Sequence, residues 1–267
     1  MNIGFIGSGN MTEATISGMI NNNFIPKNIY ILDVDKKRID YMVNRYKVVA
    51  FNTEDFFSNS DVLVLAVKPQ IVSKVLTEYK DFIKKSHLLI SIAAGISIDN
   101  ISSLISTEKI IRVMPNTPAL ISRGISALTY KSHIINDIDK EIVEKIMESI
   151  GEFVWLEETQ MNAVTALSGS GPAYVYRFID AMIDGGVLVG LPKELARKLV
   201  LETVLGSTLM VKETEKSPKE LEDQVTSPGG TTIHGLISME KNNFSCSIRE
   251  GVKAAYLRAI ELGKENK

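Results

Sequence analysis

Hydrophobic residues in the first part of the chain gather in short runs that are separated by longer amphipathic stretches. The runs are rich in β-branched residues and end at turn or polar signals, at 2–6, 29–32, 62–67, 88–93, 109–114, 124–130 and 152–156. Segments with helical spacing lie between several of them, including 137–151, for which Asp137 or Asp139 is a candidate N-cap. Strands that alternate with helices and show little polar alternation predict a mostly parallel sheet covered on both faces.

The strand pattern ends after the last of these runs, and from there the apolar residues recur at helical spacing. Pro172, Pro192 and Pro218 each stand where a helix can begin, which is the helical position that proline tolerates best. The sequence therefore predicts an α/β N-terminal domain over 1–158, followed by an all-α C-terminal domain over 159–267.

Composition narrows the classes of function. The 267 residues include 30 basic and 32 acidic ones, a net charge of −2, which gives no electrostatic footprint for nucleic acid or an anionic membrane. Cys246 is the one cysteine, so no intrachain disulfide and no Cys₄ or Cys₂His₂ metal site is expected, and a reducing cytoplasm fits. No apolar run approaches the roughly 20 residues that cross a bilayer, and the N-terminus lacks the basic start of a signal peptide. We expect a cytoplasmic protein without nucleic-acid, membrane or metal partners.

A glycine turn after the first strand predicts dinucleotide binding. In "IGFIGSGNMTEA", Gly7 can form the tight turn and Gly9 can let the backbone approach a pyrophosphate at a helix N-terminus. The third fingerprint position is Thr12, so the pattern is GxGxxT, which a generic strand–turn–helix connection also produces. Asp33 ends the second strand roughly 20 residues further on, where a carboxylate accepts from a ribose 2′-hydroxyl. This context favours a Rossmann-like N-terminal domain.

The residues around Asp33 leave the choice between NADH and NADPH open. A carboxylate at this position favours NADH and repels a 2′-phosphate. Lys36, Lys37 and Arg38 follow at once and could hold that phosphate, or they could form a solvated helix face.

Further loops follow the carboxyl ends of strands, where open α/β sheets bind ligands, at 66–70, 93–95 and 113–118. Lys68 could donate to a phosphate or a ribose hydroxyl, and Asn116 could donate its amide to a nicotinamide or a substrate. A solvated lysine and a rigid proline-shaped turn are the alternatives. The predicted cofactor-binding residues are Gly7, Ser8, Gly9, Asn10, Met11, Asp33, Ala66, Val67, Lys68, Pro69, Ala93, Ala94, Gly95 and Asn116.

Motifs along the chain together resemble the pyrroline-5-carboxylate reductases. They are, in order, "FIGSGNM", "LAVKPQ", "SIAAGIS", "RVMPNTPALISRG", "ALSGSGPAYVYRFIDAMIDGGVLVGLP" and "QVTSPGGTTIHGL". The resemblance covers residues 3–260, and its last two motifs are specific to that family. It implies the last step of proline synthesis, in which NAD(P)H reduces L-1-pyrroline-5-carboxylate to L-proline. It also implies that the helical domain interlocks with a second subunit, in dimers that can assemble further into decamers.

Two positions depart from the family pattern. Members that prefer NADPH often carry a small or polar residue after the second strand, with an arginine or serine nearby, whereas this chain has "DVDKKR". Thr12 replaces the alanine that is common at its position, and a threonine still fits a helix N-terminus.

The chemistry of a cyclic imine that carries a carboxylate sets what the helical half must supply. It needs an anion cradle for the carboxylate and a hydrogen-bonding group near the imine nitrogen. In "SPGGTT", Pro228 stiffens a turn, the two glycines permit unusual φ, and amides from Gly230 onward lead into a helix near Thr231. Ser227 could cap that helix, so a plain capped turn is the alternative. The resemblance implies that Thr232 donates its hydroxyl toward the imine nitrogen and that Ser227, Gly230 and Thr231 contact the carboxylate.

A second turn, "SGSGPAY", precedes a long helix, and helix-hairpin chemistry alone could explain it. The resemblance places this turn near the nicotinamide and the substrate, which makes Ser170 and Gly171 substrate-binding candidates. It also suggests that Glu215 helps the site of a partner subunit, although a surface glutamate needs no explanation. His234 lies beside "SPGGTT", but a satisfied or solvent-facing histidine is the favoured interpretation.

Two other functions remain open at this stage. A β-hydroxyacid dehydrogenase shares the two-part plan, but its general base is commonly a helix lysine with an asparagine one turn on. The helix after Gly171 reads "PAYVYRFID", which contains Arg177 and lacks that pair. A non-catalytic nucleotide-sensing protein would keep the fold and bind NAD(P)H without turnover.

Overall fold

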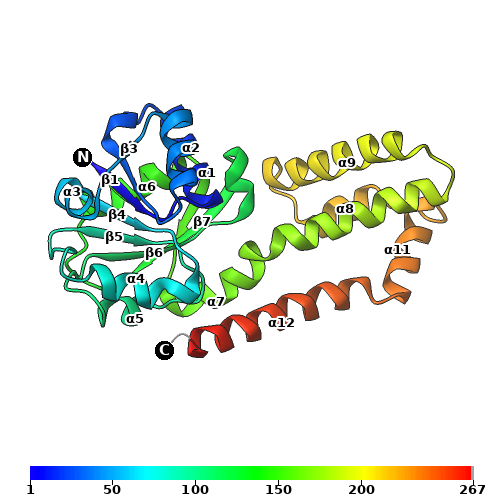
Figure 1. Cartoon of the computed structure of the whole chain (residues 1–267). Helices are drawn as coiled ribbons and strands as arrows, with labels where there is room; N and C mark the ends of the chain where they lie inside the picture. Colours follow the sequence, from blue (N-terminus) through cyan, green and yellow to red (C-terminus); the bar gives the residue numbers. More distant parts are fainter. Residues whose placement is uncertain (266–267) are drawn as a thin grey trace. The chain divides into compact units, whose positions relative to one another are not determined.

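The computed structural model describes residues 1–265, and within this range eight strands form one sheet (Figure 1). The strands are β1 (Ile3–Ile6), β2 (Ile29–Leu32), β3 (Val49–Ala50), β4 (Val62–Leu65), β5 (Leu88–Ser91), β6 (Ile110–Met114), β7 (Gly124–Tyr130) and β8 (Gly151–Trp155). Their order is β3-β2-β1-β4-β5-β6-β7-β8, and neighbours run parallel except for the antiparallel pair β6 and β7. From β1 the chain first builds the sheet toward one edge, through β2 and β3, and then returns to add β4 on the other side of β1. In open α/β sheets, ligands bind where the strand order reverses in this way.

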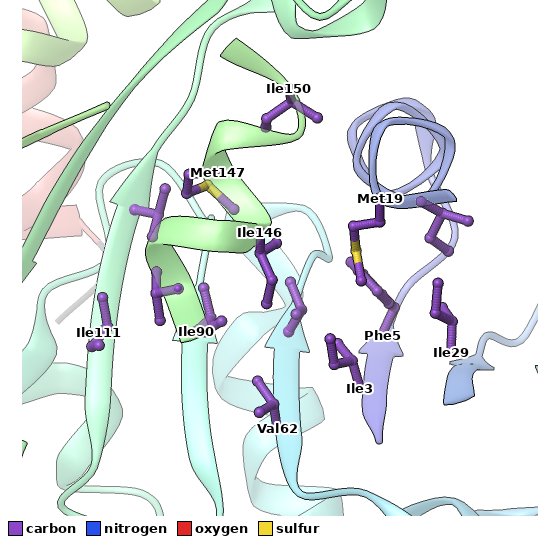
Figure 2. Packing of buried hydrophobic residues seen from close by; sticks show 14 of the residues in the cluster. Ile3, Phe5, Met19, Ile29, Val62, Ile90, Ile111, Ile146, Met147 and Ile150 are labelled. Carbon is purple, nitrogen blue, oxygen red and sulfur yellow. The ribbon is translucent and has the colours of Figure 1, made fainter. Parts of the chain in front are cut away.

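Helices cover both faces of this sheet, as the unbroken apolar runs predict. The helices of one face are α1 (Asn10–Asn21), α2 (Lys36–Tyr46) and α6 (Asp137–Glu148), and those of the other are α3 (Thr53–Asn59), α4 (Val72–Tyr79) and α5 (Ile98–Ser102). Alternate strand residues enter opposite clusters, so that Phe5 packs toward α1 whereas Ile6 packs toward α4. The cluster that includes α1 and α6 contains Ile3, Phe5, Met19, Ile29, Val62, Ile90, Ile111, Ile146, Met147 and Ile150 (Figure 2).

The start of α6 corrects one sequence prediction. The N-cap is Asn136, whose side chain accepts from the amide of Asp139 at 2.9 Å. The carboxylate of Asp139 accepts in return from the amide of Asn136 at 3.2 Å, which completes a capping box. Asp137 and Asp139 lie inside the helix, so the prediction that one of them is the cap is wrong.

Contacts divide the chain into two compact units, and each is described by itself. The first unit is Met1–Ser170 with the end of the last helix from Ala255 onward, and the second is Gly171–Ala254. The first unit also holds α7 (Met161–Val164) and a π-helical turn, Thr165–Gly169. The second unit is helical throughout its named elements, α8 (Gly171–Leu188), α9 (Lys193–Glu213), α10 (Pro218–Gln224), α11 (Thr231–Lys241) and the first part of α12 (Phe244–Glu265).

The fold class is confirmed: a Rossmann-like α/β part is followed by a helical part. The last strand ends at Trp155, shortly before the predicted boundary between residues 158 and 159. The division of the chain into domains at that boundary stays a prediction. Among the described residues, no helix is long and apolar enough to cross a membrane.

The second unit, Gly171–Ala254, is called the helical unit below, and it buries little of its own apolar surface. Its buried cluster consists of Ile183, Ala196 and Val200, with a few half-buried neighbours. Large apolar side chains are exposed along α8 and α9, and Leu188 is 87% and Leu205 56% accessible. A helical pair with so small a core gains little stability from its own packing.

Candidate dinucleotide and substrate sites

The turn between β1 and α1 has the geometry that a dinucleotide site requires. Gly7 has φ +97°, and a Cβ added there would lie 2.9 Å from the carbonyl oxygen of Ala66. A Cβ added at Gly9 would meet no described atom within 4 Å, so the backbone faces open space there. Gly9 is the N-cap of α1 and offers no side chain to the first amides of the helix. These amides can therefore donate to a pyrophosphate.

Thr12 explains how this turn tolerates a residue larger than glycine at the third fingerprint position. Its side chain is 1% exposed, and its hydroxyl donates to the carbonyl oxygen of Gly7 at 2.8 Å. The hydrogen bond holds the turn against the first helical turn of α1. Thr12 thus supports the nucleotide turn without occupying the space in front of it.

A cavity of about 370 Å³ opens from this turn toward β2 and α4. It brings together many of the predicted cofactor residues, namely Gly7, Ser8, Gly9, Asp33, Ala66, Val67 and Lys68. Residues that were not predicted complete the lining, namely Ile6, Leu32, Val34, Ile71, Val75 and Tyr79. The lining is apolar toward α4, which suits the flat face of an adenine, and polar at the end of β2.

The other predicted cofactor residues lie outside this cavity. Asn10 and Met11 begin α1, and Pro69 begins the 3₁₀ turn Pro69–Ile71. Ala93, Ala94 and Gly95 follow β5, and Asn116 follows β6, so they share the carboxyl edge of the parallel strands with Gly7. Since β4, β5 and β6 follow β1 in the sheet, these loops lie in order away from the pyrophosphate turn, on the side opposite β2.

Asn116 is oriented by a hydrogen bond within the first unit. Its Oδ1 accepts from the amide of Ile125 at 3.0 Å, which ties the loop after β6 to the start of β7. The side-chain amide Nδ2 has no hydrogen-bond partner among residues 1–265. It is the group that the sequence prediction assigned as a donor.

Asp33 is fixed at the end of β2. Its Oδ2 accepts from both the amide and the hydroxyl of Ser8, at 2.6 and 2.7 Å, and its Oδ1 accepts from the amide of Asp35 at 2.9 Å. Burial raises the pKa of this carboxyl, but these hydrogen bonds outweigh the burial and hold the pKa below its usual value. Asp33 is therefore a rigid carboxylate, and Oδ1 keeps a lone pair for a ribose hydroxyl.

The "SGSG" turn lies against the last residue of β6, Met114. It begins as the π-helical turn Thr165–Gly169, a form that is frequent at functional sites. A Cβ added at Gly169 would lie 2.7 Å from Cε of Met114, so glycine permits this close approach. The hydroxyl and the amide of Ser170 both donate to the carbonyl oxygen of Thr165, at 3.2 and 2.9 Å. Ser170 is thereby placed near the carboxyl end of β6, whereas Gly171 begins α8.

The "SPGGTT" turn leads directly into α11, as predicted. Gly229 has φ +70°, and α11 begins at Thr231 with Gly230 as its N-cap. Ser227 does not cap the helix; instead its carbonyl oxygen accepts from the amide of Gly230 at 3.1 Å. The amide of Gly230 is therefore used inside the turn, and the contact of Gly230 with a substrate carboxylate stays a prediction.

The free groups at this helix start belong to the two threonines. Neither the hydroxyl of Thr231 nor that of Thr232 has a hydrogen-bond partner within the described part of the chain. Thr231 is exposed and Thr232 is half-buried. Nδ1 of His234 pairs with the carbonyl oxygen of Gly230 at 2.9 Å, a contact within its own helical turn.

Comparisons with known proteins place this chain. A family model described as pyrroline-5-carboxylate reductase dimerisation matches residues 158–262. Proteins named pyrroline-5-carboxylate reductase from Synechocystis and Arabidopsis thaliana are 42% and 40% identical to it; each alignment covers 98% of this chain, and 98% and 95% of the relative. The chain belongs to the pyrroline-5-carboxylate reductase family.

Solved structures agree with this assignment. The pyrroline carboxylate reductase of Plasmodium falciparum, solved with NADP bound, is 36% identical at a TM-score of 0.89, and 98% of each chain is covered. The pyrroline-5-carboxylate reductase of Coxiella burnetii gives the same TM-score at 35% identity and the same coverage. A model described as NADP oxidoreductase coenzyme F420-dependent matches residues 2–95. The resemblance inferred from the motifs is confirmed.

This reductase also contains a buried ion pair that sequence reasoning missed. Arg112 of β6 is 4% exposed, and its Nη1 lies 3.3 Å from Oε1 of Glu158. The same Oε1 accepts from the amide of Ile98 at 2.8 Å, and Oε2 lies 2.9 Å from Nζ of Lys131. An arginine inside an otherwise apolar strand was the sequence signal for a buried ion pair. Its partner lies 46 residues further along the chain, so no local pattern links the two. The network joins the sheet to the segment that leads into the helices.

Proposed function

We propose that this protein reduces L-1-pyrroline-5-carboxylate to L-proline with NAD(P)H, the last step of proline biosynthesis. The observation that carries the proposal is the match of near-complete length to relatives named for this activity, which includes both the nucleotide turn and "SPGGTT". The dinucleotide turn has the open backbone, the free helix amides and the fixed carboxylate that a nicotinamide dinucleotide needs. When bound, NAD(P)H supplies the hydride.

The first unit binds the dinucleotide in this proposal. The amides at the start of α1, including those of Asn10 and Met11, would hold the pyrophosphate, and Asp33 would accept from the adenosine ribose. Lys68 and Pro69 frame the cavity beside Ala66 and Val67. The loops that carry Ala93, Ala94, Gly95 and Asn116 lie along the same edge of the sheet and would hold the nicotinamide half. Nδ2 of Asn116 would be a donor toward it.

The start of α11 binds the substrate in this proposal. The amides of Thr231 and Thr232, with the positive end of the helix dipole, attract the substrate carboxylate. The hydroxyl of Thr232 donates to the ring nitrogen and so favours the polarised C=N bond that accepts a hydride. Ser227 contributes its exposed hydroxyl. The amide of Gly230 is already bonded within the turn, so Gly230 contributes by letting the substrate come close to the backbone. Ser170 and Gly171 complete the set of substrate-binding residues.

The proposal extends to assembly and location. The dimerisation model and the exposed apolar side chains of α8 and α9 support a homodimer formed through the helices of the proposed C-terminal domain, 159–267. The proposal also includes further assembly of the dimers into decamers, a contribution of Glu215 to the partner's site and a cytoplasmic location. The proposed N-terminal domain, 1–158, needs no partner for its own core, since both faces of its sheet are covered.

An oxidation assay tests the function. Purified protein is given L-1-pyrroline-5-carboxylate with NADH or with NADPH. Oxidation of the cofactor is followed by the decrease in absorbance of the reduced nicotinamide, and proline formation is measured in the same samples. We expect turnover with at least one of the two cofactors. If a folded sample binds a cofactor but produces no proline, the protein is a nucleotide-binding protein without this activity. If the protein instead oxidises 3-hydroxy acids in a parallel assay that supplies NAD⁺ or NADP⁺, the β-hydroxyacid dehydrogenase alternative holds.

A further inference from the structure

The end of β2 presents a fixed negative charge where the adenosine ribose of a dinucleotide would lie. Asp33 lines the cavity beside Val34, which is 97% exposed. The two donors of Ser8 lock the carboxylate in place, because Ser8 itself is fully buried. A neutral 2′-hydroxyl can donate to Oδ1, whereas a 2′-phosphate has only acceptors and brings a second negative charge.

The helix that follows offers no compensating anion site. Oδ1 of Asp35 accepts from the amides of Lys37 and Arg38, at 2.9 and 3.3 Å, and so caps α2. Free amides at a helix start are what would bind a phosphate, and here a carboxylate occupies them. Asp35 therefore uses the donors of α2 and adds a second negative charge next to Asp33.

Arg38 carries a guanidinium group beside the nucleotide turn, and this group is held by other residues. Its Nη2 forms an ion pair with Glu13 of α1, and its Nε donates to the carbonyl oxygen of Ser8. Its guanidinium lies over the ring of Tyr41, 5.0 Å from the centroid. The hydroxyls of Tyr41 and Tyr46 both donate to Oε1 of Glu13, at 2.8 and 2.9 Å, so the carboxylate that holds Arg38 is itself held.

We infer that this protein selects NADH over NADPH, and that Glu13 is a positioning residue for this selection because it withholds Arg38 from a 2′-phosphate. The inference rests on the proposed function in one respect, that NAD(P)H is the hydride donor. Lys36 and Lys37 are exposed on α2, and their ammonium groups could attract a 2′-phosphate and so reduce the preference for NADH. The two lysines directly follow Asp35 in the first turn of α2, so a phosphate bound by them would also lie close to that carboxylate.

Equilibrium binding tests the selection without any substrate. Purified protein is titrated with NADH and with NADPH, and bound nicotinamide fluorescence or calorimetry gives the two dissociation constants. We expect the Kd for NADH to be lower by about tenfold or more, which corresponds to ~1.4 kcal/mol. A smaller ratio, or tighter binding of NADPH, overturns the inference. This titration contains no substrate, so it tests the cofactor preference separately from the reaction. If the protein binds NADH more tightly but makes no proline in the activity assay, only the proposed function is refuted.

Charge-only variants test which residues set the ratio. Glu13→Gln should release Arg38 and tighten NADPH binding by about three- to tenfold with little change for NADH, since a cation near a phosphate contributes on this scale. Asp33→Asn keeps the shape of the side chain and should tighten NADPH binding similarly. Asp35→Asn keeps a good N-cap and should act in the same direction.

The matched control is Glu54→Gln, which makes the same charge change on an exposed side chain of α3. It should leave both dissociation constants unchanged. Higher salt should narrow the wild-type ratio, because it screens the repulsion of the 2′-phosphate. Circular dichroism of each variant identifies any that fails to fold. If the folded Asp33→Asn and Glu13→Gln variants both keep the wild-type ratio, the assignment of selectivity to these residues is wrong.

Discussion

Thr232 has a hydroxyl that no described residue uses, at the second position of a helix whose first amides are also free. Such a group costs little to orient toward a ligand, because it gives up no hydrogen bond within the protein. Thr232→Ala should lower kcat by about 5- to 150-fold, the effect of losing one hydrogen bond of ~1–3 kcal/mol in the transition state. Steady-state kinetics and a separate NADH titration measure this, and the Kd for NADH should not change.

The control for this prediction is Thr232→Ser, which keeps the hydroxyl and should retain most of the activity. If Thr232→Ala turns over at the wild-type rate, "SPGGTT" is a capped turn with no catalytic part. His234 should matter far less, since its ring contacts its own helical turn at Gly230.

His87 predicts a pH dependence of stability. Burial, together with nearby Lys84, lowers the pKa of this imidazole below its usual value of 6.5, and its Nδ1 accepts from the amide of Lys84 at 3.1 Å. The native state therefore keeps His87 neutral, while the unfolded chain takes up a proton as the pH falls below about 6.5. The free energy of unfolding should fall from there down to the native pKa, by at most about 1.4 kcal/mol per pH unit.

Urea unfolding at a series of pH values measures that slope. His87→Asn keeps an acceptor for the amide of Lys84 and should flatten the slope between pH 6.5 and the native pKa. His133 is exposed, so His133→Asn is the matched control and should keep the wild-type slope. An unchanged slope in His87→Asn contradicts the assignment to this residue.

At the scale of elements, the Arg112–Glu158 pair joins β6 to the segment before α7. Glu158→Ala would leave a guanidinium that is 4% exposed without its main partner. Breaking a buried pair from one side destabilises by about 3–5 kcal/mol, because the remaining charge stays desolvated. Thermal and urea unfolding should register this loss. Replacing both residues, as Arg112→Met with Glu158→Gln, should recover a substantial part of it.

Sequence patterns predicted elements well where they have a period. The runs at 29–32 and 124–130 became β2 and β7 with the same bounds, because apolar strands between helices leave a clear signature. The two residues of β3 are too few for any period, and the antiparallel entry of β7 depends on pairing that no local pattern records. The cap of α6 was missed because Asn136 precedes two aspartates of similar propensity.

The candidate site shows the same division. Gly7, Gly9 and Asp33 were found because their roles follow from residue type and spacing along the chain. The use of the amide of Gly230 within its turn, and the grip of Glu13 on Arg38, are decided by local backbone geometry and by a contact across 25 residues. Neither leaves a mark in composition or periodicity, so both needed the structure.

At the scale of the whole molecule, the helical unit predicts association. Its buried cluster is confined to Ile183, Ala196 and Val200, while Leu188, Leu199 and Leu205 are exposed. Many exposed large apolar side chains on one pair of helices are normally covered by another chain. Light scattering after gel filtration at micromolar concentration should therefore give at least twice the mass of one chain.

Charged substitutions separate association from folding. Leu199→Lys together with Leu205→Lys should lower the measured mass toward that of one chain and lower the unfolding temperature, since the monomer would leave the apolar faces of α8 and α9 in water. The matched control, Leu120→Lys, changes a leucine that is 54% exposed in the first unit and should leave the mass unchanged. The first unit has its own two-sided core, so binding of NADH should survive in the dissociated variant while turnover falls if the partner completes the substrate site. A wild-type protein that is monomeric at micromolar concentration would contradict the dimer, because the exposed leucines would then need no partner chain.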